Sequence, residues 1–183
     1  QHGFIIREGA DKFKNDTTGQ PSAVKDTVLK FNQGTITAEK MVGENTEVAK
    51  KVKDKAALTE VFDLHKVGNP AKNAAGKYEV VLVVPGLTNE YTNIIVVHYS
   101  HTGNAWEVIE IPATDVDYTK KEIKAQFTDF SPVAIFATKT ATSTGSGTTS
   151  DGTVGTSSTW MLWAAAALVV VGAGVVVSQK KSR

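Results

Sequence analysis

Residues 93–109 read NIIVVHYSHTGNAWEVI, and this stretch indicates the fold class. Its first seven residues form a nearly continuous apolar run, which is typical of a central strand covered on both faces. Residues 101–104, with the sequence HTGN, have the composition of a turn. Residues 106–111 follow the turn and have the composition of a second strand. We therefore predict two strands joined by a short turn.

More strands are expected on both sides of this pair. Residues 77–84 and 122–127 alternate between the two faces of a strand, and residues 133–137 form a short apolar run after a Ser-Pro pair. Residues 27–39 read TVLKFNQGTITAE, which predicts a hairpin with a short glycine-containing loop. Residues 58–67 predict a further strand.

One stretch has a helical period. In residues 44–57, Val48, Val52 and Ala56 recur every four residues, with lysines between them, which indicates a helix with one solvated face. Many strands, frequent turns and one short helix predict a mainly β fold. We expect residues 27–137 to form a single β-sandwich-like domain.

The composition excludes several classes of protein. The chain has 183 residues, enough for one ordinary domain with additional segments. It has no cysteine, which rules out a disulfide scaffold, a zinc–thiolate site, an iron–sulfur cluster and a cysteine nucleophile. Three of its 20 basic residues lie in the last four positions, so the rest carries 17 basic against 19 acidic residues. That balance does not indicate a nucleic-acid partner.

The C-terminus has the pattern of a membrane anchor. Residues 160–177 read WMLWAAAALVVVGAGVVV, and 18 such residues in a helix span about 27 Å, close to the hydrocarbon thickness of a bilayer. Tryptophans at the start suit the headgroup region, and the basic residues that follow predict a cytoplasmic C-terminus. We expect a transmembrane helix over 160–178 and a basic tail over 179–183. The residues assigned to the anchor are Trp160, Trp163, Leu168, Val169, Gly172, Lys180, Lys181 and Arg183.

Two further segments are expected to be linkers. Residues 138–159 are nearly all Thr, Ser and Gly, and such a tether of 22 residues reaches about 25 Å on average and about 75 Å at full stretch. Residues 1–26 are expected to be a linker or the end of an upstream region. A cytoplasmic C-terminus places the domain outside the cell, so we expect an export signal upstream of Gln1.

Three strings carry a family resemblance: TEVFDLHKVGNPAKNAAGKYEVVLVVPGL at 59–87, the quoted stretch at 93–109, and AQFTDFSPVAIFA at 125–137. They resemble a domain common near the C-termini of Gram-positive cell-surface proteins. The Val-Pro-Gly turn, the His-Tyr…Gly…Trp-Glu-Val hairpin and the Phe-Ser-Pro-Val-Ala-Ile closing strand carry the resemblance, which covers about residues 27–137. It implies a membrane-proximal, non-catalytic module of an exported surface protein.

The tail departs from that family in one respect. Sortase substrates of such proteins carry Leu-Pro-x-Thr-Gly before the apolar helix, whereas the last proline here is Pro132 and residues 149–153 read TSDGT. We therefore expect the protein to stay in the cell membrane as a single-pass protein and not to be linked covalently to the wall.

Polar residues give no catalytic or metal-binding signature. His98 and His101 are three apart, which on a strand directs them to opposite faces. Asp63 and His65 are two apart and could pair as an orienting acid and a base, although no nucleophile accompanies them. The acids Glu107, Glu110, Asp115 and Asp117 are expected to be solvated. Asp115, Asp117 and Asp129 could bind calcium, but no calcium-loop pattern contains them. We predict no catalytic residue, no cofactor and no metal.

Three functions fit these observations. The first is a non-enzymatic stalk or spacer for upstream domains, with the lipid bilayer as its partner. The second is an adhesin or carbohydrate-binding module for a cell-wall or host-surface ligand, which would need an exposed aromatic such as Trp106 or Tyr91. For Trp106 and Tyr99, on facing strands, packing in the core is the expectation. The third is the C-terminal anchor region of a larger surface enzyme.

Overall fold

The computed structural model of the chain describes residues 3–7, 22–130, 132–140 and 169–171. Its helices are α1 (Ser22–Asn32), α2 (Ala38–Val42) and α3 (Glu47–Val52), with a 3-10 helix at Ala113–Asp115. Its strands are β1 (Gly3–Arg7), β2 (Ala56–Ala57), β3 (Asp63–Val67), β4 (Tyr78–Val83), β5 (Tyr91–Ser100), β6 (Ala105–Glu110), β7 (Val116–Asp117), β8 (Glu122–Phe127), β9 (Val133–Lys139) and β10 (Val169–Val171).

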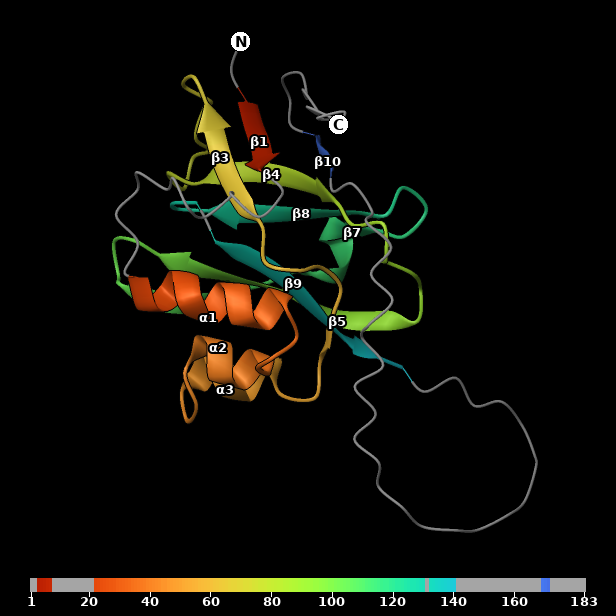
Figure 1. Cartoon of the computed structure of the whole chain (residues 1–183). Helices are drawn as coiled ribbons and strands as arrows, with labels where there is room; N and C mark the ends of the chain where they lie inside the picture. Colours follow the sequence, from red (N-terminus) through yellow and green to blue (C-terminus); the bar gives the residue numbers. More distant parts are fainter. Residues whose placement is uncertain (1–2, 8–21, 131, 141–168, 172–183) are drawn as a thin grey trace, which may run out of the picture.

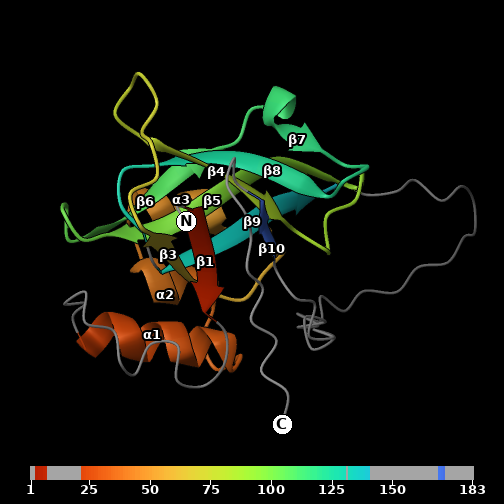
Figure 2. The same ribbon diagram turned by 90° about the horizontal axis from the view of Figure 1, so that it is seen from above.

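The described strands form three antiparallel sheets. One has the order β2-β9-β5-β6, the second β10-β4-β8-β7, and the third pairs β1 with β3. The three helices lie on one side of the β5–β9 sheet and the β4–β8 sheet lies on the other, so the layers are helix, sheet and sheet (Figure 1). In the view from above, α1 and β7 lie on opposite sides of the molecule (Figure 2). The mainly β prediction is confirmed, whereas the prediction of one short helix is wrong, because the described residues contain three α-helices that pack on the β5–β9 sheet.

The larger core fills the space between the two four-stranded sheets. The strands β4, β8 and β9 contribute alternate residues to it, as the two-residue period of a strand requires. Thus β8 buries Ile123, Ala125 and Phe127, which the alternation in the sequence predicted. The predicted apolar face of β4 is confirmed as well, since Val80 and Leu82 are fully buried.

The second core lies between the helices and the β5–β9 sheet. The odd-numbered positions Ile95 and Val97 of β5 face it, while Val96 faces the first core. The strand β5 is therefore covered on both faces over residues 94–100, and the prediction of a central strand is confirmed. On the helical side Val28 of α1 and Val52 of α3 are almost completely buried.

The predicted hairpin over residues 27–39 is wrong. Residues 22–32 form α1, in which Val24, Val28 and Phe31 recur at helical spacing on the face toward the sheet. Gly34 has φ 77° and its N–H donates to the Phe31 carbonyl at 2.9 Å, so the glycine ends a helix instead of closing a hairpin. The β-branched and aromatic residues of this short stretch fit the period of a strand and that of a helix equally well. Packing against β9 and β5 favours the helix.

The helix expected over 44–57 is shorter than predicted. Thr46 begins α3 by accepting a hydrogen bond from the Ala49 N–H at 3.0 Å. The helix ends at Val52 because Lys53 is extended and Asp54 has φ 62°. Ala56 then belongs to β2, which pairs with the end of β9.

The N-terminal segment expected to be a linker contributes structure. Its residues 3–7 form β1, which pairs with β3 in register from Gly3↔Val67 to Arg7↔Asp63. Phe4 is buried and its ring packs on Phe130 and Tyr78. Residues 22–26, within the same expected linker, begin α1.

The predicted anchor is described only at Val169–Val171. These three residues form β10, which pairs with Val83–Val81 of β4, and therefore differ from the expected helix. Such pairing satisfies the backbone groups along the edge of β4. The tether expected over 138–159 begins later than predicted, because β9 extends to Lys139. Residues 141–168 and 172–183 lie outside the described residues, so the membrane span stays a prediction. Among the described residues, no helix has the length and hydropathy needed to cross a bilayer.

Candidate functional site

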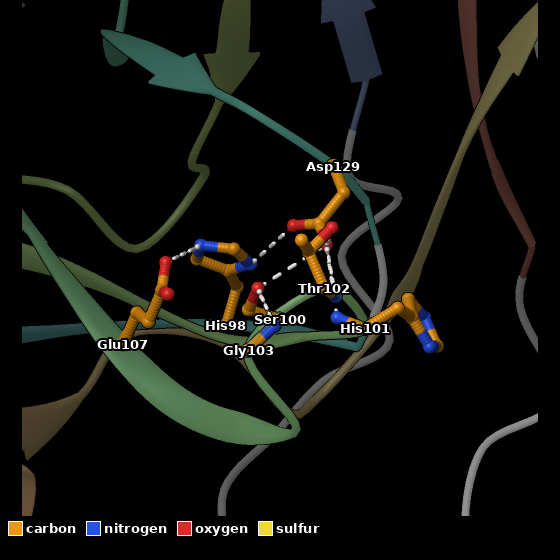
Figure 3. A network of polar contacts seen from close by, with 7 residues as sticks. All are labelled: His98, Ser100, His101, Thr102, Gly103, Glu107 and Asp129. Carbon is orange, nitrogen blue, oxygen red and sulfur yellow. Dashed lines mark hydrogen bonds and ion pairs between the residues drawn. The ribbon is translucent and has the colours of Figure 1, made fainter.

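Among the described residues, a connected cluster of polar side chains surrounds His98. His98 comes from β5, and Glu107 is its cross-strand partner on β6. Asp129 lies between β8 and β9, and residues 100–103 belong to the turn between β5 and β6 or adjoin it (Figure 3). The cluster thus joins segments that are about 30 residues apart in the sequence.

His98 lies between two carboxylates. Its side chain is 1% exposed, and its ring contacts Phe127 edge-on at 5.8 Å. The Nε2 atom is 3.2 Å from Glu107 Oε2, whereas Nδ1 is 3.6 Å from Asp129 Oδ1 (Figure 3). Among the described residues, neither His98 Nδ1 nor Asp129 Oδ1 has a hydrogen-bond partner. A neutral imidazole that donates Nε2–H to Glu107 directs a lone pair at Asp129.

Asp129 fixes the turn between β5 and β6. Its Oδ2 atom accepts hydrogen bonds from the backbone N–H of His101 at 2.9 Å and from that of Thr102 at 3.3 Å. The hydroxyls of Ser100 and Thr102 approach the same oxygen at 3.3 and 3.5 Å. The carboxylate is therefore compensated mainly by the turn, and only Oδ1 is left to interact with His98.

The charge state of His98 follows from its burial. Loss of solvent lowers the pKa of His98 below its ordinary value of 6.5, while the charges of Asp129 and Glu107 act in the opposite direction and raise it. Burial prevails because Glu107 is 48% exposed and Asp129 is beyond hydrogen-bond distance. His98 is thus neutral at pH 7.

The cluster is not arranged for nucleophilic catalysis. Ser100 Oγ donates to Asp129 and accepts from the Gly103 N–H at 3.1 Å, so it bonds to the acid and not to the imidazole. A serine nucleophile needs the base within hydrogen-bond reach of its hydroxyl. His101 does not complete a site either: its ring points away from the cluster (Figure 3) and packs on Tyr99.

The second predicted pair is confirmed in its geometry. Asp63 Oδ2 lies 2.5 Å from His65 Nε2 on the same face of β3. Asp63 is 1% exposed, and its strand neighbour in β1 is Arg7. The pair therefore lies where β1 joins the domain.

The remaining acids are dispersed. Glu110 pairs with Lys51 of α3 at 2.5 Å, and Asp117 accepts the N–H groups of Thr119 and Lys120 in a turn. Asp115 lies in the 3-10 helix. The described part of the chain holds no group of three or more His, Asp or Glu side chains placed to bind a metal ion.

The aromatic residues proposed for sugar binding pack against the cores. Tyr99 and Trp106 lie directly opposite each other with their rings edge-to-face at 5.6 Å, so their predicted packing is confirmed. Trp106 and Tyr91 are both partly buried against the cores. The exposed aromatic in the described residues is Tyr118, whose hydroxyl donates to the Tyr91 carbonyl at 2.7 Å.

Sequence reasoning considered Asp129 only as a calcium ligand and missed its contacts with the turn and with His98. The short polar turn HTGN was visible, but nothing local links it to an acid 27 residues later. The predicted anchor residues Trp160, Trp163, Leu168, Gly172, Lys180, Lys181 and Arg183 lie outside the described residues.

Comparison with known proteins adds no relative. No protein-family model, no curated protein and no solved structure matches this chain.

Proposed function

We propose that this chain is a non-enzymatic cell-surface module of a Gram-positive bacterium, carried outside the membrane on a single-pass C-terminal anchor. In this proposal the β-sandwich-like domain acts as a stalk or spacer for upstream domains. Residues 160–178 cross the bilayer as a helix, which requires Val169–Val171 to leave their pairing with β4, and the residues that follow β9 connect this span to the domain. The apolar 160–177 stretch followed by three basic residues supports the anchor.

The position of β9 carries the proposal for the domain. The tether would leave from the end of β9, which lies inside its sheet between β2 and β5. A pull along β9 therefore loads the hydrogen bonds of two antiparallel ladders at the same time. A strand at the edge of a sheet would resist with one ladder only.

Contacts at the end of β9 reinforce this attachment. The Thr140 N–H donates to the Glu90 carbonyl at 2.7 Å. Lys55 Nζ donates to Thr138 Oγ1 at 2.9 Å and to the Asn93 carbonyl at 2.8 Å. In Figure 1, β1 lies at the top of the domain and the end of β9 at the lower right, so load entering at one would pass through the body to the other.

Fractionation of cells that express the full chain tests the anchor. We expect the protein to sediment with membranes, to resist carbonate extraction and to dissolve in detergent. A form that stays in the wall fraction after detergent and is released by muramidase would contradict membrane retention. A protein that is soluble without detergent would contradict the anchor itself.

A further inference from the structure

The strand β4 has one edge whose partner depends on where the C-terminal segment lies. Among the described residues, the edge away from β8 is paired only with β10, in register from Val169↔Val83 to Val171↔Val81 (Figure 1). Insertion of residues 160–178 into a bilayer as a helix would withdraw this partner. The anchored chain therefore leaves this edge of β4 open.

The backbone groups at the open edge follow from the alternation along β4. The Val84 N–H donates to the Lys121 carbonyl at 2.7 Å, on the side of β8. Alternate residues of an antiparallel strand direct their N–H and C=O groups to opposite sides, so those of Val81 and Val83 point to the other edge. Without β10, two donors and two acceptors there lose their strand partners.

The side chains along this edge do not oppose pairing with another strand. Residues 80–84 of β4 carry no charge, and Val81 and Val83 are partly exposed. The edge strand β6, by contrast, carries the exposed acids Glu107 and Glu110. Exposed charges are one means by which proteins protect the edges of sheets. The β4 edge lacks this protection over the residues that β10 covers.

We propose that the β4 edge is the site at which two anchored copies of this chain associate, β4 against β4, and that β10 covers it in a chain that is not inserted. The proposal rests on the proposed anchor. An antiparallel pair centred on Leu82 places Val81 opposite Val83 of the second copy, and Val83 opposite its Val81. Each of these two pairs exchanges two hydrogen bonds, which satisfies the groups that β10 leaves.

The segment paired with β4 indicates why a second copy fits. The sequence of β10 is VVV, and residues 81–83 of β4, with which it pairs, read VLV. A second β4 thus offers nearly the same sequence in the same antiparallel direction, with Leu82 in the place of Val170. The resulting interface is two-fold symmetric and closes at the dimer. Anchoring in one membrane also raises the effective concentration of the copies.

Crosslinking of the full chain in cell membranes tests the proposal. The chain has no cysteine, so Val81→Cys provides a single thiol at the β4 edge. With a short bismaleimide we expect a crosslinked dimer from Val81→Cys. The control Lys120→Cys, beside β7 at the opposite edge of the same sheet, should stay monomeric.

Fractionation of the same cells separates the two ways in which the test can fail. A membrane-bound Val81→Cys chain that gives no more dimer than Lys120→Cys would overturn this inference and leave the anchor standing. A chain absent from the membrane fraction would refute the anchor, and this inference with it.

Variants in the Val81→Cys background assign the contact. Val83→Pro removes an N–H at the open edge and leaves the ladder with β8, so the dimer should be lost, whereas Val83→Thr should retain it. If Val83→Pro does not fold, Val83→Lys replaces it and should also lose the dimer, since it puts a charge at the edge and lies opposite Glu122 of β8.

One further variant tests the cover. Gly172→Lys should keep the chain out of the membrane with β10 still on β4, and should therefore give no dimer. A dimer that survives Val83→Pro and Val83→Lys, or that forms equally in a non-inserted Gly172→Lys chain, would contradict the proposal.

Discussion

Replacing Asn32 with alanine should weaken the attachment of α1 to the sheets. Asn32, the last residue of α1, is linked to a residue 29 positions later: its Nδ2 donates to the Val61 carbonyl at 2.9 Å, and its Oδ1 accepts from the Val61 N–H at 2.7 Å. The amide thus pairs with Val61 as a neighbouring strand would. Val61 is 0% exposed, so Asn32→Ala leaves a buried donor and a buried acceptor without these partners.

The expected loss is about 2–3 kcal/mol of unfolding free energy, since each unsatisfied buried group costs about 1–3 kcal/mol and the half-buried site of Asn32 lets some water reach them. With a urea slope of about 2 kcal/mol/M, the midpoint falls by about 1–1.5 M. Circular dichroism at increasing urea concentration measures this midpoint. The exposed neighbour Gln33 provides the control, since Gln33→Ala should change the unfolding free energy by less than about 0.5 kcal/mol. An Asn32→Ala variant as stable as Gln33→Ala would refute the reasoning.

Lys55→Met should lower the force needed to unfold the domain by pulling on its C-terminus, because the bond to Thr138 is lost, and should lower the unfolding free energy by about 1 kcal/mol. Single-molecule force measurements compare it with the control Lys53→Met. Equal unfolding forces for the two variants would contradict this prediction. Thr46→Ala should cost about 1 kcal/mol in urea unfolding through loss of the α3 cap; a wild-type midpoint would argue against the cap. Gly172→Lys should abolish membrane retention, since a lysine at mid-bilayer costs about 2.5–3.5 kcal/mol. Continued sedimentation as an integral protein would contradict the span.

The strands could be predicted where packing leaves a regular trace in the sequence. The bounds of β8 were predicted from its alternation, and the burial of β5 on both faces was predicted from its apolar run. Residues 27–31 misled the prediction because five residues rich in Thr, Val, Leu and Phe fit a strand and one helical turn alike. Only the contact of Val28 and Phe31 with the sheet decides between them.

The candidate site was predictable only where its members are close in sequence. Asp63 and His65 share a face of one strand, so their pairing followed from spacing alone. The approach of Asp129 to His98 depends on how β8 and β9 pack over β5, and no local pattern contains that information. The strand β1 was missed since five residues between polar segments carry too little periodicity to indicate a strand.

Labelling of single cysteines on intact cells tests the proposed display most directly. The chain contains no cysteine, so Lys53→Cys on the exposed surface of the domain and Ser182→Cys in the tail each provide a unique thiol. With a membrane-impermeant maleimide, the account predicts that Lys53→Cys reacts on intact cells and that Ser182→Cys reacts only after permeabilisation. Reaction of both thiols on intact cells, or of neither before lysis, would contradict an extracellular domain on a C-terminal membrane anchor.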